Sequence, residues 1–324
     1  MKVLVSGAGG FLGQQVVERL VKGGHQVRAI IRPASPAPAW AAHVEIFRAD
    51  LRVPDNLISA FANIDAVIHA AAATTGDENL RFASTVAATE NFLSAMAQTP
   101  VKRLIHVSSF VVYDWSQAKL VLDESTTLQN DMYDMGGYTI AKIWQERVVT
   151  KFASSHSWDL TIMRPGFIWG RQHEEIAGMG RRFGRTYVMF GPRTRLPLCY
   201  VANCADCIAT ALEKPASIGQ TFNAIDGDAV RVWRYVREHV TRTGQRAWLI
   251  PLPYFVGLGM AHLAAFTSRI LFGKKGRLPS LLVPRRYESQ FKPLRFSNRK
   301  LTELLEWNPP LSFEECLSDT YMKH

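Results

Sequence analysis

A tyrosine and a lysine, Tyr138 and Lys142, stand four positions apart in segment 136–142, whose sequence is Gly-Gly-Tyr-Thr-Ile-Ala-Lys. On a helix this spacing places the two side chains one turn apart on the same face. A phenol ordinarily titrates near ~10, and a neighbouring ammonium favours the phenolate, which brings the pKa toward the range where a tyrosine shuttles protons. The pair therefore predicts a proton shuttle, although the same spacing also arises by chance on amphipathic helices.

A glycine-rich turn follows a short apolar segment at the start of the chain. Residues 2–6 have the pattern of a buried parallel strand, and a helical pattern begins at Leu12. Between them, Gly7, Gly10 and Gly13 have the spacing Gly-x-x-Gly-x-x-Gly. Free N–H groups and the helix dipole at such a turn favour a pyrophosphate, with the three glycines serving the tight turn, phosphate approach and helix packing in that order. We therefore predict dinucleotide binding; an ordinary glycine-rich loop is the alternative.

Apolar periodicity alternates between strand-like and helical runs over the first half of the chain. Strands are expected at residues 2–6, 26–31, 44–48, 66–69, 102–107 and 159–164, and helices at 12–22, 54–62, 80–97 and 137–153. This alternation predicts an α/β fold with a doubly wound parallel Rossmann sheet, whose ligand lies beyond the carboxyl ends of the strands. Later helices are expected near 204–213, 230–241, 254–272, 297–306 and 312–322, and a strand at 221–224.

The composition is typical of a soluble α/β enzyme. The chain has 324 residues, 47% of them hydrophobic, and can bury one large core or two moderate ones. Met1 leads directly into a strand pattern, and the four cysteines suggest no disulfide framework, so a cytoplasmic setting is expected. Cys199, Cys204 and Cys207 are close in sequence but have no nearby histidine, so they predict packing and no metal site.

The net charge of +10 belongs to the second half of the chain. Residues 1–165 carry 15 basic and 15 acidic side chains, whereas residues 166–324 carry 23 basic and 13 acidic ones. No helix-turn-helix, zinc finger or RNA-binding signature accompanies this charge, so no nucleic-acid partner is expected. A small anionic substrate or a membrane surface suits a charge confined to this half better.

Together and in this order, the glycine turn and the Tyr138/Lys142 pair resemble the extended branch of the short-chain dehydrogenase/reductase superfamily. This branch includes NAD(P)-dependent epimerases, dehydratases and 3β-hydroxysteroid dehydrogenases. The likeness extends through segments 65–72, 106–113, 164–170, 200–206 and 297–309, with Ser109 at the position of the catalytic serine. The resemblance implies a Rossmann domain over residues 1–165 and a smaller substrate-binding lobe over 166–324, with elements near 197–225 returning to the Rossmann sheet.

The resemblance also implies how three side chains act. Tyr138 donates a proton to the substrate oxygen in reduction and removes it in oxidation, Lys142 lowers the tyrosine pKa and anchors the nicotinamide ribose, and Ser109 hydrogen-bonds the substrate oxygen. Because neighbouring side chains on an extended strand face opposite ways, only one of Ser108 and Ser109 is expected to reach the pocket. Many relatives carry an asparagine where this chain has Thr85, so a role for that position is left open.

The second expected strand is followed by a basic residue in place of an acidic one. An acid there would accept hydrogen bonds from the ribose hydroxyls and repel a 2′-phosphate. Arg32 and Ser35 are instead placed to hold that phosphate, so NADP(H) is predicted; NAD(H) is the alternative if Arg32 only stacks on the adenine. With the resemblance, the expected cofactor-binding residues are Gly7, Gly10, Phe11, Leu12, Gly13, Arg32, Ser35, Asp50, Leu51, Ala70, Ala71, Tyr138, Lys142 and Pro165.

The sequence gives two indications about the substrate, and they conflict with each other. Phe167 stands where nucleotide-sugar members of the branch commonly carry an asparagine, which favours a lipophilic or ring substrate. Against this, an arginine set falls in Gly-rich loops where those members grip phosphates, at Arg171, Arg181, Arg182, Arg185, Arg193 and Arg195. Phe167, Arg171 and Tyr200 are the expected substrate contacts.

The predicted reaction is hydride transfer between NADP(H) and a secondary alcohol or ketone. A nucleotide-sugar epimerase is the alternative, and a dehydratase is less favoured because the apolar Phe110 and Val111 follow Ser109. The third hypothesis is a non-catalytic, NADP-sensing regulator, which the presence of Ser109, Tyr138 and Lys142 together disfavours.

Residues 247–268 contain no Asp, Glu, Lys or Arg. The segment has about the length that crosses a bilayer, but Pro251, Pro253 and His262 weaken that interpretation, and a pocket lid or core helix is expected. Peripheral membrane contact, aided by the basic residues Arg269, Lys274, Lys275 and Arg277, is the alternative. The resemblance further implies a homodimer formed through two helices per subunit, one of them the helix at 137–153.

Overall fold

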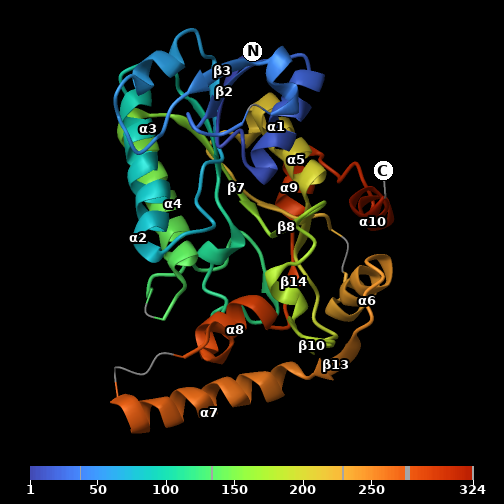
Figure 1. Cartoon of the computed structure of the whole chain (residues 1–324). Helices are drawn as coiled ribbons and strands as arrows, with labels where there is room; N and C mark the ends of the chain where they lie inside the picture. The colour runs from blue at the N-terminus through green and yellow to red at the C-terminus, as the bar shows by residue number, and fades with distance from the viewer. Residues whose placement is uncertain (37, 133, 228–229, 274–277, 323–324) are drawn as a thin grey trace.

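Seven parallel strands form one sheet at the centre of the molecule (Figure 1), in the order β12-β7-β5-β4-β1-β2-β3. The computed structural model describes residues 1–36, 38–132, 134–227, 230–273 and 278–322. The strands are β1 Lys2–Ser6, β2 Gln26–Ile31, β3 Glu45–Arg48, β4 Ala66–His69, β5 Arg103–Val107, β7 Asp159–Pro165 and β12 Thr221–Ala224. The expected strands over residues 1–165 and at 221–224 are thus confirmed, as is the α/β Rossmann fold.

The strand order reverses beside β1. Val3 of β1 pairs with Val27 of β2 on one side and with Ala66 of β4 on the other, so β1 starts both halves of the sheet. Val3, Leu4 and Val5 are completely buried, as expected for a parallel strand covered on both faces. Ligands of such sheets bind in the crevice at this reversal, beyond the carboxyl ends of the strands.

Helices cover both faces of the sheet (Figure 1). One layer contains α1 Phe11–Lys22, α5 Val201–Glu213 and α9 Arg299–Leu305. The other contains α3 Ala88–Met96 and α4 Gly137–His156. Cys199, Cys204 and Cys207 are buried as free thiols in the core beneath the first layer, which is the packing position expected of them.

The second expected helix, over 54–62, is wrong in type, because the chain forms only a 3-10 turn at Leu57–Phe61. Pro54 lies just before this turn and Asn63, with φ of 57°, just after it, so a full α-helix does not develop. The expected helix over 80–97 is split into α2 Glu78–Phe82, a π-helical turn at Ala83–Ala87 and α3. Further 3-10 turns are Ala39–His43, Phe110–Val112, Ala177–Met179, Pro215–Ser217 and Ser280–Leu282.

A smaller lobe extends from the carboxyl edge of the sheet, toward the bottom of Figure 1. It contains a three-stranded sheet whose strand order is β13-β10-β9, which the sequence pattern did not predict. Two short strand pairs, β8 with β11 and β6 with β14, complete the sheets. The elements are β6 Val121–Leu122, β8 Phe167–Trp169, β9 Arg181–Phe183, β10 Thr186–Phe190, β11 Leu198–Tyr200, α6 Val232–Arg242, β13 Trp248–Leu252, α7 Tyr254–Phe272, α8 Pro284–Phe291, β14 Arg295–Phe296 and α10 Phe313–Tyr321.

Helix α7 departs from the expectation of a core helix. Tyr254, Gly257 and Ala261 are its only buried residues, and the rest of the helix is exposed to different degrees. Among the described residues it is the one helix long and apolar enough to cross a membrane by length and composition. Of the basic residues expected to aid membrane contact, Arg269 is exposed on α7, whereas Lys274, Lys275 and Arg277 lie outside the described residues.

Candidate active site

Tyr138 and Lys142 both lie at the start of α4, where the sequence placed them. Gly136 caps the helix and Gly137 is its first residue, buried so tightly that a Cβ there would lie 2.9 Å from Cγ of Glu78. Tyr138 is partly exposed, whereas Lys142 is only 2% exposed. The ammonium of Lys142 donates to the carbonyl oxygen of Val107 at 2.8 Å and to Oε1 of Gln145 at 2.5 Å. The lysine is thus fixed between α4 and the end of β5.

Loss of solvent contact is the main cause of the pKa shifts of both side chains. It lowers the pKa of Lys142 to about 7, against the opposing charge of Glu146. The surrounding protein raises the pKa of Tyr138, while a hydrogen bond with Ser109 works in the opposite direction. The expectation that Lys142 lowers the pKa of Tyr138 stays a prediction. In this structure the nitrogen of Lys142 is bonded to Val107 O and Gln145.

Ser108 and Ser109 face opposite ways, as expected at the end of a strand. Ser108 is buried and donates a short hydrogen bond to Oε2 of Glu146. The same carboxylate holds Arg164 in a buried ion pair, with N–O distances of 2.5 and 3.1 Å. Ser109 is partly exposed and contacts Tyr138. The two serines are thereby separated into one that fastens the helix to the strand and one that faces the site.

A buried polar network continues behind Lys142. Gln145 donates to Ala71 O at 2.8 Å and to the hydroxyl of Thr89 at 2.9 Å. That hydroxyl contacts Nε2 of His69 at 2.8 Å, and Nδ1 of His69 contacts Ser6 Oγ at 2.6 Å. Burial lowers the pKa of His69 to about 3, so the ring is neutral at physiological pH. The network ties β1, β4 and α4 together at the point where the strand order reverses.

Thr85, whose role was left open, lies in the π-helical turn and is buried. Its hydroxyl accepts a hydrogen bond from the N–H of Ala73 at 3.0 Å. The threonine therefore supports the loop after β4, beside the predicted cofactor residues Ala70 and Ala71, which are partly exposed.

The glycine turn has the geometry that a dinucleotide needs. Gly7 has φ of 73°, and a Cβ there would lie 2.7 Å from the backbone nitrogen of Ala71. A Cβ at Gly13 would overlap the carbonyl oxygen of Gly7, so the start of α1 packs directly on the turn. Helix α1 begins at Phe11 with no side-chain cap and no acid in its first turn, and Leu12 follows within that turn. Such a helix end suits an anionic group, so these residues fit the pyrophosphate of a nicotinamide cofactor.

The expected adenosine end of the cofactor site is rich in arginine. Arg32 is exposed directly after β2. Arg48, at the end of β3, donates to Pro33 O and Ser35 O, both at 3.0 Å, and so supports the loop that carries Arg32. Asp50 is paired with Arg52 at 2.5 Å, and first this hydrogen bond and then the more distant charge of Arg32 lower its pKa. Leu51, the other predicted adenine neighbour, is buried.

The predicted substrate contacts have different surroundings. Phe167 is partly exposed and packs against two buried apolar clusters, one of which contains Phe110. Tyr200 is buried and donates a short hydrogen bond to Asp319 of α10, and Arg171 donates to Met322 O at 3.0 Å. Tyr200 and Arg171 are therefore engaged by the C-terminal part of the chain. Pro165 ends β7, opposite Ala224 of β12.

A second correction concerns three of the arginines that were expected in loops beside the pocket. Arg181 and Arg182 lie on β9, the edge strand of the three-stranded sheet, and Arg185 lies in the turn to β10. Arg182 donates to Gln245 Oε1 at 2.6 Å, beside β13. The Gly/Arg-rich sequence therefore builds a hairpin, because alternate residues Tyr187 and Met189 of β10 are apolar and buried.

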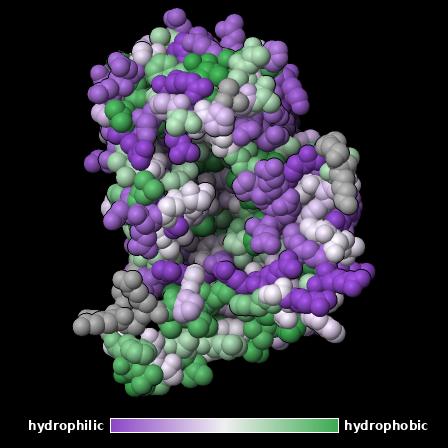
Figure 2. Space-filling model, viewed as in Figure 1, coloured by the Kyte–Doolittle hydropathy of each residue, from purple (hydrophilic) through white to green (hydrophobic). Residues whose placement is uncertain are grey.

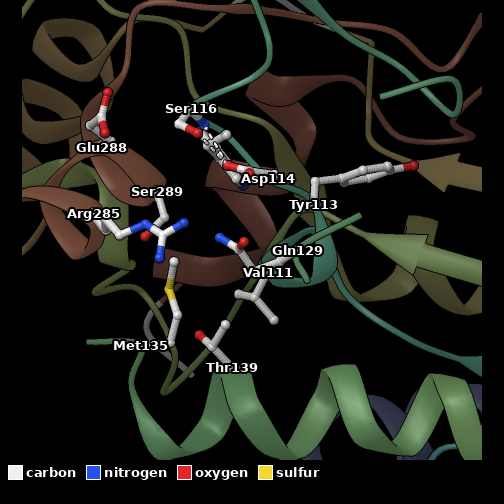
Figure 3. A pocket seen from close by; sticks show the side chains of 11 residues that line it. Val111, Tyr113, Asp114, Ser116, Gln129, Met135, Thr139, Arg285, Glu288 and Ser289 are labelled. Carbon is white, nitrogen blue, oxygen red and sulfur yellow. Dashed lines mark hydrogen bonds between the residues drawn. The ribbon is translucent and has the colours of Figure 1, made fainter. Parts of the chain in front are cut away.

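A cavity adjoins the Tyr138 end of α4 (Figure 3). Its apolar lining residues are Val111, Trp115 and Met135, and Thr139 of α4 adds a hydroxyl. Figure 3 shows Gln129 and Arg285 pointing toward one another across it. Its remaining lining residues are Tyr113, Asp114, Ser116, Glu288 and Ser289. Val111 and Thr139 are close in sequence to Ser109 and Tyr138. The cavity thus offers a mixed apolar and polar surface next to the candidate catalytic groups.

Comparison with known proteins identifies the class that this fold and site define. Residues 3–224 match the NAD dependent epimerase/dehydratase family, and the chain belongs to that family. The resemblance to the extended short-chain dehydrogenases/reductases is thereby confirmed.

Individual relatives include oxidoreductases that are similar over most of the chain. The chain is 27% identical over 288 residues to the 4-hydroxy-2-methyl-3-oxo-4-farnesyl-3,4-dihydroquinoline-1-oxide ketoreductase of Stigmatella aurantiaca, covering 87% of this chain and 84% of that one. It is 27% identical to a 3-beta-hydroxysteroid dehydrogenase of Mycolicibacterium neoaurum, covering 98% and 90%. Among solved structures, UDP-glucose 4-epimerase of Thermotoga maritima matches with a TM-score of 0.73 at 18% identity, covering 99% and 97%, which is a likeness of fold.

Three residues with a clear place around the site were missed in the sequence. Gln145 and Glu146 follow Lys142 by three and four positions, so helical spacing alone could have placed them beside it. Arg48 carries the same signal as Arg32, a basic residue at the end of a strand in the same half of the sheet. Their partners are up to 76 positions away, and no local pattern identifies those partners.

Proposed function

We propose that this protein is an NADP(H)-dependent oxidoreductase that moves a hydride between the cofactor and a secondary alcohol or ketone on a lipophilic or ring substrate. The single observation that carries this proposal is the contact of Ser109 with Tyr138, one helical turn from the buried Lys142. A hydroxyl and a phenol that lie together are placed to bind one substrate oxygen and to exchange a proton with it.

Each side chain then has a defined task. When bound, the nicotinamide supplies or accepts the hydride. Tyr138 donates a proton to the substrate oxygen in reduction and removes it in oxidation, and Ser109 orients that oxygen. Lys142, fixed by Val107 O and Gln145, presents its ammonium to the cofactor ribose and to the phenolate as it forms. Glu146 fastens this helix to β5 and β7 through Ser108 and Arg164.

Tyr138→Phe tests the assignment of the proton donor. Loss of the hydroxyl should lower kcat by at least about 10³-fold and leave the Kd for NADPH within a few-fold, because the phenyl ring keeps its packing. Tyr235→Phe is the matched control, since its hydroxyl donates to Glu174 O at 2.8 Å in the smaller lobe and Tyr235 does not line the cavity. Retained turnover in Tyr138→Phe contradicts the scheme.

NADP(H) is favoured over NAD(H) by the basic groups at the ends of β2 and β3. Arg32 offers a guanidinium to a 2′-phosphate, and Arg48 supports its loop. Arg32→Ala should weaken NADPH binding about 10- to 100-fold and leave NADH binding within two-fold. Isothermal titration with both cofactors measures this, and equal losses for the two would refute the assignment.

A nucleotide-sugar 4-epimerase is the second candidate, favoured by the fold shared with UDP-glucose 4-epimerase. The proposal of a lipophilic substrate instead rests on Phe167, which packs against two apolar clusters, and on the two oxidoreductase relatives. Thermal shift of the NADPH-loaded protein with sugar nucleotides, steroid or terpenoid alcohols and aromatic ketones separates the two. Stabilisation by a free nucleoside diphosphate would favour the epimerase, and NADPH turnover with any ketone would exclude a purely regulatory role.

We also propose a cytoplasmic homodimer that uses the outer side of α4. Trp144 of this helix is exposed and carries Arg147 over its ring, and Leu80 and Phe82 of the adjacent α2 are exposed as well. Light scattering of wild type and Trp144→Glu tests the dimer; a wild-type monomer at micromolar concentration contradicts it.

A further inference from the structure

Helix α7 presents an unusually apolar surface at the edge of the smaller lobe. Eight of its large apolar side chains are exposed, among them Phe255 at 75% and Leu271 at 71%; the others are Val256, Met260, Leu263, Phe266, Ile270 and Phe272. Figure 1 shows α7 as the outermost helix of the lobe, and Figure 2 shows hydrophobic atoms gathered along the same edge. A contiguous exposed apolar surface of this kind marks a site of interaction.

The helix is nevertheless attached to the protein along one stripe. Tyr254, Gly257 and Ala261 face the body, and a Cβ at Gly257 would overlap the hydroxyl of Tyr287 in α8. That hydroxyl donates to Tyr254 O at 3.2 Å, and the two tyrosine rings stack at 5.7 Å. With one side held by α8, lipid cannot surround α7, so the geometry suits a helix that lies in an interface plane.

The strand before α7 extends the apolar surface. Trp248 and Ile250 alternate on one side of β13 and are exposed, Trp248 to 75%. Tryptophan is enriched at the boundary between lipid headgroups and acyl chains, where its ring meets both environments. The patch therefore continues from an aromatic strand edge into the apolar helix.

The charge around this apolar surface indicates whether it binds a second copy of the chain or a lipid membrane. The elements of this surface, β9, β10, β13 and α7, contain no Asp or Glu, and Arg181, Arg182 and Arg269 lie on them. Arg181, Arg185, Arg246 and Arg269 are exposed around the patch. A second copy of this chain would bring two such basic surfaces face to face in a symmetric contact, and their repulsion opposes it. An anionic lipid surface attracts them.

We propose that α7 and the edge of β13 form a docking surface for an anionic phospholipid membrane, with the helix lying in the headgroup plane. Helix α8 joins this surface to the cavity, because Tyr287 contacts α7 while Arg285, Glu288 and Ser289 line the cavity. Docking therefore brings the cavity close to the bilayer. The proposal stands independently of the reaction proposed above.

Cosedimentation of the full chain with lipid vesicles tests this surface. Wild type should bind vesicles in which about a third of the lipid is phosphatidylglycerol at least ten-fold more tightly than pure phosphatidylcholine, and salt should weaken the binding. Leu263→Ser/Phe266→Ser/Ile270→Ser should bind about 100-fold more weakly, because three apolar side chains leave the lipid. Arg185→Glu/Arg246→Glu should bind about ten-fold more weakly.

The control is Val53→Ser/Leu120→Ser, which removes exposed apolar side chains from other elements and should leave vesicle binding unchanged. Circular dichroism should give the same thermal midpoint for all variants, since each altered side chain is exposed. Wild type that stays in solution with both vesicle types would overturn the proposal. A wild-type dimer that the triple variant dissociates would also overturn it, because the patch would then bind a second copy of the chain. Protein that stays on the vesicles after an alkaline carbonate wash would overturn it as well, because α7 would then span the bilayer.

Discussion

Replacing Lys142 with methionine tests whether the site holds this lysine against its tendency to be charged. The structure lowers its pKa from 10.5 to about 7 by burial, a shift that corresponds to about 4–5 kcal/mol. Below pH 7 the folded and unfolded chains both carry the proton, and the folded chain bears the full cost of burying the charge. Between pH 7 and 10.5 only the unfolded chain holds the proton, so stability rises with pH through this window.

Methionine has nearly the same length and cannot titrate. The variant loses the hydrogen bonds to Val107 O and Gln145, a cost of about 1–3 kcal/mol each that does not depend on pH. At neutral pH the free energy gained by removing the buried charge nearly cancels the free energy lost with the two hydrogen bonds. As the pH rises from about 7 to about 9.5, the unfolding free energy of wild type should increase by about 3 kcal/mol relative to Lys142→Met.

Urea unfolding of both proteins across this pH range measures the difference, and groups that titrate alike in the two proteins cancel. Lys151→Met is the matched control, because Lys151 is exposed on the same helix, and its difference from wild type should stay within about 0.5 kcal/mol. A difference between wild type and Lys142→Met that is flat from pH 7 to 9.5 would falsify the inference that burial has depressed this pKa.

Further predictions concern the serines and the glycine turn. Ser109→Ala should lower kcat about 10²-fold. It should also move the rising limb of the oxidation rate, which follows deprotonation of Tyr138, to higher pH, because Ser109 lowers the pKa of Tyr138; a pH–rate profile with an unmoved limb argues against this. Ser108→Ala should keep kcat within a few-fold but cost about 1–3 kcal/mol in urea unfolding, because Glu146 loses a buried donor, so a large loss of kcat would reverse the two roles. Gly13→Ala should raise the Kd for NADPH at least about 100-fold in calorimetry, since its Cβ overlaps the turn; a Kd within three-fold of wild type contradicts that packing.

The central sheet was predictable because its strands are buried on both faces. Continuous apolar runs such as Val3-Leu4-Val5 identify such strands without any knowledge of their neighbours. The buried partners of the site were not predictable in the same way. Glu146 meets Ser108 across 38 positions, and only the assembled fold shows that this carboxylate serves both a strand serine and Arg164.

The C-terminal half was harder because its elements are short or have ambiguous hydropathy. Strand β9 has three exposed residues, Arg181 to Phe183, and strand pairing alone defines it. Helix α7 has the composition of a core helix, and hydropathy cannot distinguish an apolar surface that the protein buries from one that it exposes. Both errors arise because burial depends on contacts that composition does not contain.

The conflict between Phe167 and the arginine set is reduced once the fold locates them. Arg181, Arg182 and Arg185 belong to a hairpin beside β13, and, like α7, this hairpin contains no Asp or Glu. Phe167 packs with the cluster that contains Phe110, the residue after Ser109. The positive charge of these three arginines is therefore better explained by a surface than by a phosphate-bearing substrate in the pocket. The membrane-docking surface and the proton donor proposed above would together suit a substrate that partitions into anionic lipid.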